Sequence, residues 1–312
     1  MAARTEALTT RDIVLKDLTK GARTDIKGQG FQILLLLSLL ISLLFLVVLL
    51  LDIFFNALPV LQERGISDVI EKPVSSLAER AGVSQGIYGS LLLTAFVVVI
   101  AFPLGIGAAV YLEEYAADTR FNRFINVNVR NLAGVPSVVF GLLGLALFVK
   151  LFSSFTGGRT VLSAGLTLAI LVLPLVIITA AEAIRAVPNS IREAGYGVGA
   201  TKWEVIRSHV LPSAAPGILT GTVLSLSRAI GETAPLLMVG AVSGFFAVQA
   251  DTVWDRLQSN FTALPVIVYN WARQPSEGFR ELVSVAIIVL LVLTLSANAI
   301  AIVLRNRYDR KW

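Results

Sequence analysis

The sequence contains no cysteine and a single histidine, His209, among its 312 residues. The absence of cysteine excludes disulfide bonds, thiolate chemistry and cysteine-ligated metal sites, and one histidine argues against a transition-metal site. Charged residues are also scarce, at 15%, against about 25% in an ordinary soluble domain. Apolar residues make up 55% of the chain, which is more than a water-soluble fold of this size can bury. Lipid is therefore the expected solvent.

The formal net charge of +5 does not indicate nucleic acid as a partner. The basic residues lie at the ends of apolar runs and not in a compact patch interleaved with aromatic side chains. This distribution is typical of signals that orient a protein in a membrane.

Six uncharged runs are each long enough to cross a hydrocarbon core, which takes about 20 residues. They cover residues 30–51, 86–112, 131–149, 160–181, 210–227 and 282–304. The first run is longer than the core of a signal peptide and is followed by no small-residue cleavage site, so we expect it to remain as a helix. The predicted fold is an all-α, polytopic transmembrane helical bundle with about six spans.

The distribution of Lys and Arg predicts the orientation. With the N-terminus in the cytoplasm, 17 of these residues fall in cytoplasmic segments and eight on the opposite side. The positive-inside rule therefore places both termini in the cytoplasm. Residues 11–20 mix apolar and charged side chains, which fits either a short helix on the membrane surface or a solvated tail.

Two stretches depart from simple spans. Residues 210–250 are apolar except for Arg228 and Glu232, and they are too many for one helix. We expect an irregular or re-entrant continuation after about Met238. Residues 257–272 are uncharged but only 16 in number and contain Pro265, which predicts a partial or interfacial helix on the outer side.

The loop at residues 193–212 reads EAGYGVGATKWEVIRSHVLP. Ser190 with Glu193 three residues later has the spacing of a capping box, and Trp203, Ile206 and Val210 share one face of a second predicted helix. A helix, a glycine-containing turn and another helix therefore fit this loop. Its small residues permit close backbone approach, which suggests a docking element.

These residues resemble the EAA motif of the membrane subunits of ABC importers. Glu193, Ala194, Gly199, Leu211 and Pro212 match the motif, Gly195 replaces its last Ala, and His209 stands where an aliphatic residue is usual. The resemblance implies that the loop docks on an ATP-hydrolysing subunit and transmits its closure to the spans. The chain has no GxxxxGK[ST] phosphate loop, so the partner would bind ATP and Mg and this chain would bind no cofactor.

Arg228 and Glu232 lie four residues apart, a spacing that places them on one face of a helix. Charges within the membrane are costly and need a reason. One interpretation is a salt bridge that only locks packing. The other is that Arg228 meets an anion in the translocation path while Glu232 holds the guanidinium when the path is empty, since a guanidinium can donate two parallel hydrogen bonds to a phosphate.

Three further segments resemble permeases of the phosphate-specific transport family, PstA type. They are GVPSVVFGLLGLALF (134–148), SRAIGETAPLL and ALPVIVYNWARQPSEGFREL (263–282). The resemblance implies a phosphate importer subunit, not an enzyme, in the bacterial inner membrane, with a PstC-type permease, two PstB-type ATPases and a PstS-type binding protein as partners. A sulfate- or molybdate-like oxyanion permease and the sister PstC type are the alternatives.

On this interpretation residues 1–29 form a cytoplasmic tail, 30–51 the first transmembrane helix and 52–85 a periplasmic segment. Residues 86–304 form the permease core with the coupling loop at 186–212, and 305–312 form a cytoplasmic tail. An intramembrane enzyme is disfavoured because no HExxH motif or paired aspartates occur at membrane depth. The coupling loop argues against a secondary transporter. Gly217 with Gly221, and Gly141 with Gly144, permit close helix packing within the chain or between subunits.

Overall fold

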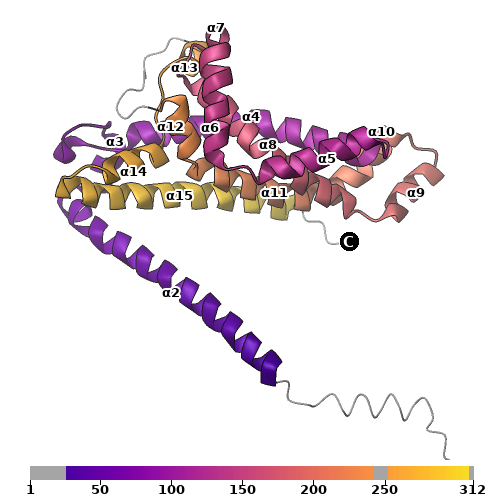
Figure 1. The fold of residues 1–312 in the computed structure, drawn as a ribbon, viewed down its shortest axis with the longest axis horizontal. Helices are drawn as coiled ribbons and strands as arrows, with labels where there is room; N and C mark the ends of the chain where they lie inside the picture. The colour runs from indigo at the N-terminus through magenta and orange to yellow at the C-terminus, as the bar shows by residue number, and fades with distance from the viewer. Residues whose placement is uncertain (1–25, 242–251, 309–312) are drawn as a thin grey trace, which may run out of the picture. The chain divides into compact units, whose positions relative to one another are not determined.

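The computed structural model describes residues 26–241 and 252–308, and the predicted surface helix at residues 11–20 lies outside these ranges. The chain divides into two compact units, Met1–Asp52 and Ile53–Trp312. Helix α2 (Ile26–Glu63) continues past its predicted end at residue 51 (Figure 1). From residue 28 to residue 52 every side chain is exposed, although most are apolar. Such a helix is stable only where lipid or another protein covers it.

The prediction of about six spans is confirmed. In the described part of the chain five helices are long and apolar enough to cross a membrane, and a bent pair makes up to six. The pair consists of α5 (Arg120–Ala133) and α6 (Ser137–Gly144), which a π-helical turn extends to Leu151, and the two parts meet at 104°. The apolar run at 131–149 therefore does not form one straight helix. Its first residues end α5, and the chain turns at Pro136, which precedes α6 and cannot donate a backbone hydrogen bond.

Helix α8 (Val161–Arg185) is the central element of the bundle. Within its apolar window 72% of the residues are buried, against 22% for the span that contains α4 (Ser84–Val110) and 6% for the span of α15 (Glu277–Tyr308). Helices α4, α5, α6 and α11 (Leu211–Gly231) all pack against α8. A large buried cluster is formed where α4 and α8 meet residues 229–239 and 261–266 of the chain.

Small residues allow this close packing. A Cβ atom added to Gly217 of α11 would lie 2.7 Å from the Cβ of Ala183 on α8, and one added to Gly221 would collide with Thr179. Gly144 of α6 meets Thr167 of α8 in the same way. The predicted close packing is thus confirmed, and both glycine pairs are used within the chain.

Short elements connect the long helices: α3 (Gly65–Glu71), a 3₁₀ turn (Ala78–Arg80), α7 (Ser153–Thr156), α12 (Ala234–Val239), α13 (Val253–Leu257) and α14 (Leu264–Ala272). Arg64 donates hydrogen bonds to Asp68 and to the carbonyls of Ala78 and Ala81. Hydrogen bonds from Lys72 and Arg64 hold the pKa of the Asp68 carboxyl below its usual value. These contacts tie the segment before α4 together.

Helix α14 confirms the predicted partial helix, and it lies inside the protein. Leu264, Val266 and Ile267 are fully buried, and α14 packs against α15 and α4. Ser90 accepts a hydrogen bond from the backbone N–H of Leu264 at 2.9 Å, which satisfies a donor at the start of the helix. Protein therefore surrounds this short helix on the sides that its buried residues face.

Two neighbouring glycines of α4 give a matched test of this packing. A Cβ at Gly105 would lie 2.6 Å from Val176 on α8, whereas nothing lies within 4 Å of a Cβ at Gly107. We expect Gly105→Leu to lower the free energy of unfolding by about 1–3 kcal/mol through overpacking. Gly107→Leu should be neutral or slightly stabilising, because it gains the same helix propensity as Gly105→Leu without the collision. Thermal unfolding in detergent measures both, and equal midpoints would contradict the packing described.

Candidate coupling loop and intramembrane charged pair

The loop after α8 folds as two short helices around a glycine turn, as predicted. Helix α9 (Asn189–Gly197) ends before Gly199, whose φ of +80° is left-handed and favours glycine. Helix α10 (Lys202–Val205) follows, and a π-helical turn (Ile206–Val210) joins it to α11. The loop is therefore rigidly continuous with the fifth predicted span.

The predicted cap of the first loop helix is wrong. Helix α9 starts after Pro188 with no side-chain cap, whereas the capping box forms at Thr201 and Glu204 at the start of α10. Pro188 already fixes the entry of the chain into α9, so Ser190 falls inside the helix and not at its cap.

The motif residues divide into exposed and buried positions. Glu193, Ala194, Gly199 and Pro212 are exposed and Leu211 is half-buried. Gly195 is buried, and a Cβ there would lie 2.7 Å from Val205, so a small residue at this position keeps α9 against α10. Gly195, which replaces the last Ala of the motif, therefore fits the close contact with Val205.

Apolar side chains are exposed on the same loop. Val198 is 84% exposed, Trp203 53% and Tyr196 44%. Of the face predicted for the second helix, Ile206 and Val210 are buried, but Trp203 is not. Large exposed apolar side chains beside an exposed carboxylate are typical of a surface that another protein covers.

Two arginine–glutamate pairs anchor the loop, and the sequence did not reveal them. Arg192, next to Glu193, donates to Glu114 at 2.8 Å and to the carbonyls of Ile184 and Val187. Arg185, at the end of α8, donates from Nε to Glu113 at 3.1 Å and forms a second hydrogen bond to the same carboxylate. The two glutamates lie on a π-helical turn (Tyr111–Tyr115) that ends α4.

The two pairs differ in solvent exposure. Side-chain exposure is 17% for Arg192 and 6% for Glu114, but 55% for Arg185 and 13% for Glu113. Breaking a buried pair is costly because one charge stays desolvated, while exposed pairs contribute little. The Arg192–Glu114 pair is therefore the stronger anchor between α9 and α4.

The second candidate feature is the charged pair in α11. Arg228 lies in the last turn, and Glu232 is the first residue after the helix, with ψ of 118°. The prediction that one helix carries both is therefore wrong: α11 ends at Gly231 and α12 begins at Ala234. The irregular continuation expected after about Met238 falls mostly on residues 242–251, which lie outside the described ranges. Arg228 Nε still donates to Glu232 at 3.2 Å, with side-chain exposures of 42% and 16%.

The exposed positions of α11 form one stripe. Thr220, Leu224 and Arg228 follow each other at intervals of four residues, so the guanidinium lies on the surface of this subunit and not in its core. Its two terminal nitrogens make no hydrogen bond within the part of the chain that the structure describes. The Arg228 guanidinium can therefore donate hydrogen bonds to a further anionic partner from outside the bundle.

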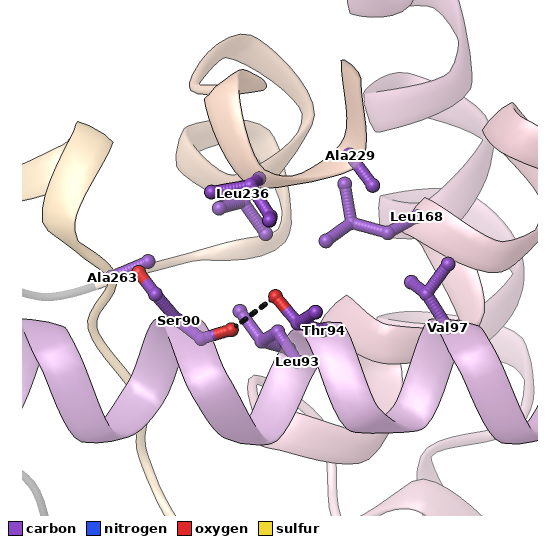
Figure 2. A pocket seen from close by; sticks show the side chains of 9 residues that line it. Ser90, Leu93, Thr94, Val97, Leu168, Ala229, Leu236 and Ala263 are labelled. Carbon is purple, nitrogen blue, oxygen red and sulfur yellow. Dashed lines mark hydrogen bonds between the residues drawn. The ribbon is translucent and has the colours of Figure 1, made fainter. Parts of the chain in front are cut away.

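An interior pocket lies near this region but is too small for a solute. Its volume is about 10 Å³, which holds about one water molecule, and its walls include Ser90, Leu93 and Leu236 (Figure 2). The Thr94 hydroxyl donates to the Ser90 carbonyl at 2.6 Å and is thereby satisfied. The pocket is a packing defect and not a binding chamber. Within residues 26–241 and 252–308, no cluster of three His, Asp or Glu side chains could hold a metal ion.

Residues 101–310 match the family described as binding-protein-dependent transport system inner membrane component, over about two thirds of the chain. The chain belongs to this family. It is similar to the phosphate transport system permease protein PstA 1 of Mycobacterium tuberculosis (strain CDC 1551 / Oshkosh), with 35% identity over 72% of each chain. It is also similar to PstA of Yersinia pestis, with 34% identity over 70% of this chain and 71% of that one.

Two solved ABC transporter structures share the fold. The inward-facing MetNI methionine transporter aligns with a TM-score of 0.58 at 17% identity, over 73% of this chain and 96% of that chain. A bacterial transporter involved in import of the acidic polysaccharide alginate aligns with a TM-score of 0.59 at 15% identity, over 91% and 99%. The predicted type I ABC importer permease fold and the resemblance to PstA-type permeases are confirmed. The chain is a multi-pass inner membrane component of an ABC importer, and the family implies an ATPase and a binding protein as partners.

The adjacent glutamates Glu113 and Glu114 give a matched test of the anchors. We expect Glu114→Gln to cost about 3 kcal/mol of stability, because Arg192 would remain largely buried without its counter-charge. Glu113→Gln should cost about 0–1 kcal/mol, because Arg185 is solvated. Thermal unfolding of the purified complex compares them, and a larger loss in Glu113→Gln would disprove the assignment.

Proposed function

We propose that this chain is one of two permease subunits of an ATP-driven importer of inorganic phosphate. The relatives named as phosphate permeases support this, and Arg228 is the observation within the chain that carries it. Its guanidinium is half-exposed on an apolar span and is held through one nitrogen by Glu232. The free edge can bind an oxyanion with two parallel hydrogen bonds.

Glu232 has a complementary role in this proposal. Its carboxylate neutralises Arg228 when no anion is present, and it competes with the anion afterwards. A solute must bind weakly enough to leave the path, and this competition prevents trapping. Because Glu232 lies at the helix break, a shift of the segment after α11 would change the Arg228–Glu232 distance directly.

The coupling loop is proposed to dock on the ATPase. Glu193 and Ala194 supply the exposed motif positions, Gly195 keeps α9 against α10, and Gly199 makes the turn. Leu211 and Pro212 then connect the loop to α11. Closure of the ATPase would move α9, and the continuity of α10, the π-helical turn and α11 would carry that movement toward Arg228.

The proposed assembly contains a PstC-type permease, an ATPase dimer of PstB type and an extracytoplasmic binding protein of PstS type. ATP and Mg would be bound by the ATPase and not by this chain. Both termini would lie in the cytoplasm, so that the coupling loop faces the ATPase. Another oxyanion of similar shape, such as sulfate or molybdate, is the alternative substrate.

Replacement of Arg228 tests the solute contact. We expect Arg228→Gln to reduce phosphate uptake by about 10–100-fold while the complex still assembles. This reduction corresponds to the loss of about one to two charge-assisted hydrogen bonds. Arg228→Lys should retain part of the uptake, because it keeps the charge but not the planar fork. Uptake into proteoliposomes measures this. Normal transport by Arg228→Gln would return the residue to a packing role, and competition by sulfate would favour the alternative substrate.

Replacement of Glu193 tests docking. Because its side chain is exposed, Glu193→Trp should leave the fold intact but abolish uptake, with ATP hydrolysis no longer stimulated by the binding protein. Glu63→Trp, the same change at an exposed position far from the loop in sequence, is the control and should transport normally. Unchanged coupling between ATP hydrolysis and uptake in Glu193→Trp would exclude docking at this position.

A further inference from the structure

A second, larger cavity lies away from Arg228, where the turn that ends α4 meets α5 and the end of α8. Its volume is about 360 Å³, within the range of ligand pockets, and its walls combine seven polar residues with four apolar ones. Three guanidinium groups line it, together with two carboxylates and two amides: Arg123, Arg130, Arg185, Glu113, Asp118, Asn122 and Asn126. This end of the bundle also carries the coupling loop.

Helix α5 presents its polar side to this cavity. Asn122, Asn126 and Arg130 follow each other at intervals of four residues, and all three line the wall. Phe121 and Phe124 do not line it and are 70% and 64% exposed. This is the reverse of an amphipathic helix in a soluble protein, where the polar side faces outward. The arrangement suits a hydrated cavity with lipid or protein outside it.

The guanidinium groups of the cavity differ in their pairing. Arg185 is held by Glu113, and Arg123 donates to both oxygens of Asp118 at 3.1 and 3.2 Å. Arg130 makes no hydrogen bond or ion pair within the part of the chain that the structure describes, and the same holds for the Asn126 amide. Glu182 and Arg130 both line a smaller adjoining cavity, so a carboxylate there offsets part of the positive charge of that cavity. Arg130 and Asn126 are thus two neighbouring donors without an acceptor.

We propose that this cavity binds a phosphate group through Arg130, with Asn126 as a second donor and Arg123 completing the positive wall. A planar guanidinium matches phosphate geometry, and 360 Å³ accommodates the group with water around it. Two sources offer this chemistry: inorganic phosphate leaving the translocation path, or the headgroup of an anionic phospholipid. The first source rests on the proposed function, whereas the second does not.

Competition within the cavity makes this a weak site. Glu113 and Asp118 already hold two of the three guanidinium groups, so an incoming phosphate group competes with them for Arg185 and Arg123. Weak binding is what a release site or an exchangeable lipid site requires. Because Glu113 neighbours Glu114, the cavity wall is directly connected to the anchor of the coupling loop.

The test uses the complex of the two permeases and the ATPase in nanodiscs, without the binding protein, whose own phosphate site would mask the signal. Arg228→Gln is the background, so that phosphate at the path residue does not contribute. Binding of radiolabelled inorganic phosphate is measured in phosphatidylcholine discs. In a second arm, complexes purified from membranes that contain phosphatidylglycerol are analysed for retained lipid by mass spectrometry. Arg130→Gln is the test variant in both arms. Arg120→Gln is the control, because Arg120 is exposed on the same helix but does not line the cavity.

If the source is free phosphate, Arg130→Gln weakens phosphate binding about tenfold or more, Arg130→Lys weakens it less, and Arg120→Gln changes it less than twofold. If the source is lipid, Arg130→Gln loses retained phosphatidylglycerol and leaves phosphate binding unchanged. The proposal is overturned if Arg130→Gln changes neither quantity, or if Arg120→Gln matches it. Wild-type uptake is measured in parallel, so that failure of phosphate import is distinguished from failure of the cavity site.

Discussion

The close packing of α8 against its neighbours is the constraint on which the other features depend. In lipid there is no hydrophobic force to bring apolar helices together, so shape complementarity between small residues has to do so. Gly217 and Gly221 bring α11 against α8, and Gly144 brings α6 against it. These contacts set where α11 lies, and α11 carries the coupling loop at one end and Arg228 at the other. The docking surface and the charged pair therefore belong to one rigid element.

The sequence predicted the elements whose physical basis is local. Span number followed from the length of uncharged runs, and the turn in the loop followed from glycine, since Gly199 adopts a left-handed φ. Where two local signals for the start of a helix lie close together, the sequence does not show which of them is used. Pro188 and the Thr201–Glu204 capping box took the roles expected of Ser190 and Glu193. Pro136 interrupts the apolar run at residues 131–149, but the size of the bend there, 104°, does not follow from the length of the run.

Features that depend on tertiary contact were not predictable. Arg192 and Glu114 are 78 positions apart, and Arg185 and Glu113 are 72 apart, so no spacing rule relates them. The burial of α14 likewise depends in part on α4, which is distant in sequence. The polarity of α5 is readable in its sequence, but only the fold reveals that its polar side faces a cavity. Arg228 was found because a charge inside an apolar run is itself a local anomaly.

The π-helical turn at the end of α4 has a consequence for how the subunit tolerates change in length. A π-helical turn accommodates one residue more than an α-helical turn, and it directs the adjacent Glu113 and Glu114 toward two different arginines. Gly105 fixes α4 against α8 two turns earlier. The number of residues between that contact and the glutamates is therefore constrained. One inserted or deleted residue rotates the following part of the helix, including both glutamates, by about 100°. Substitutions are therefore tolerated in this stretch far more readily than changes in its length.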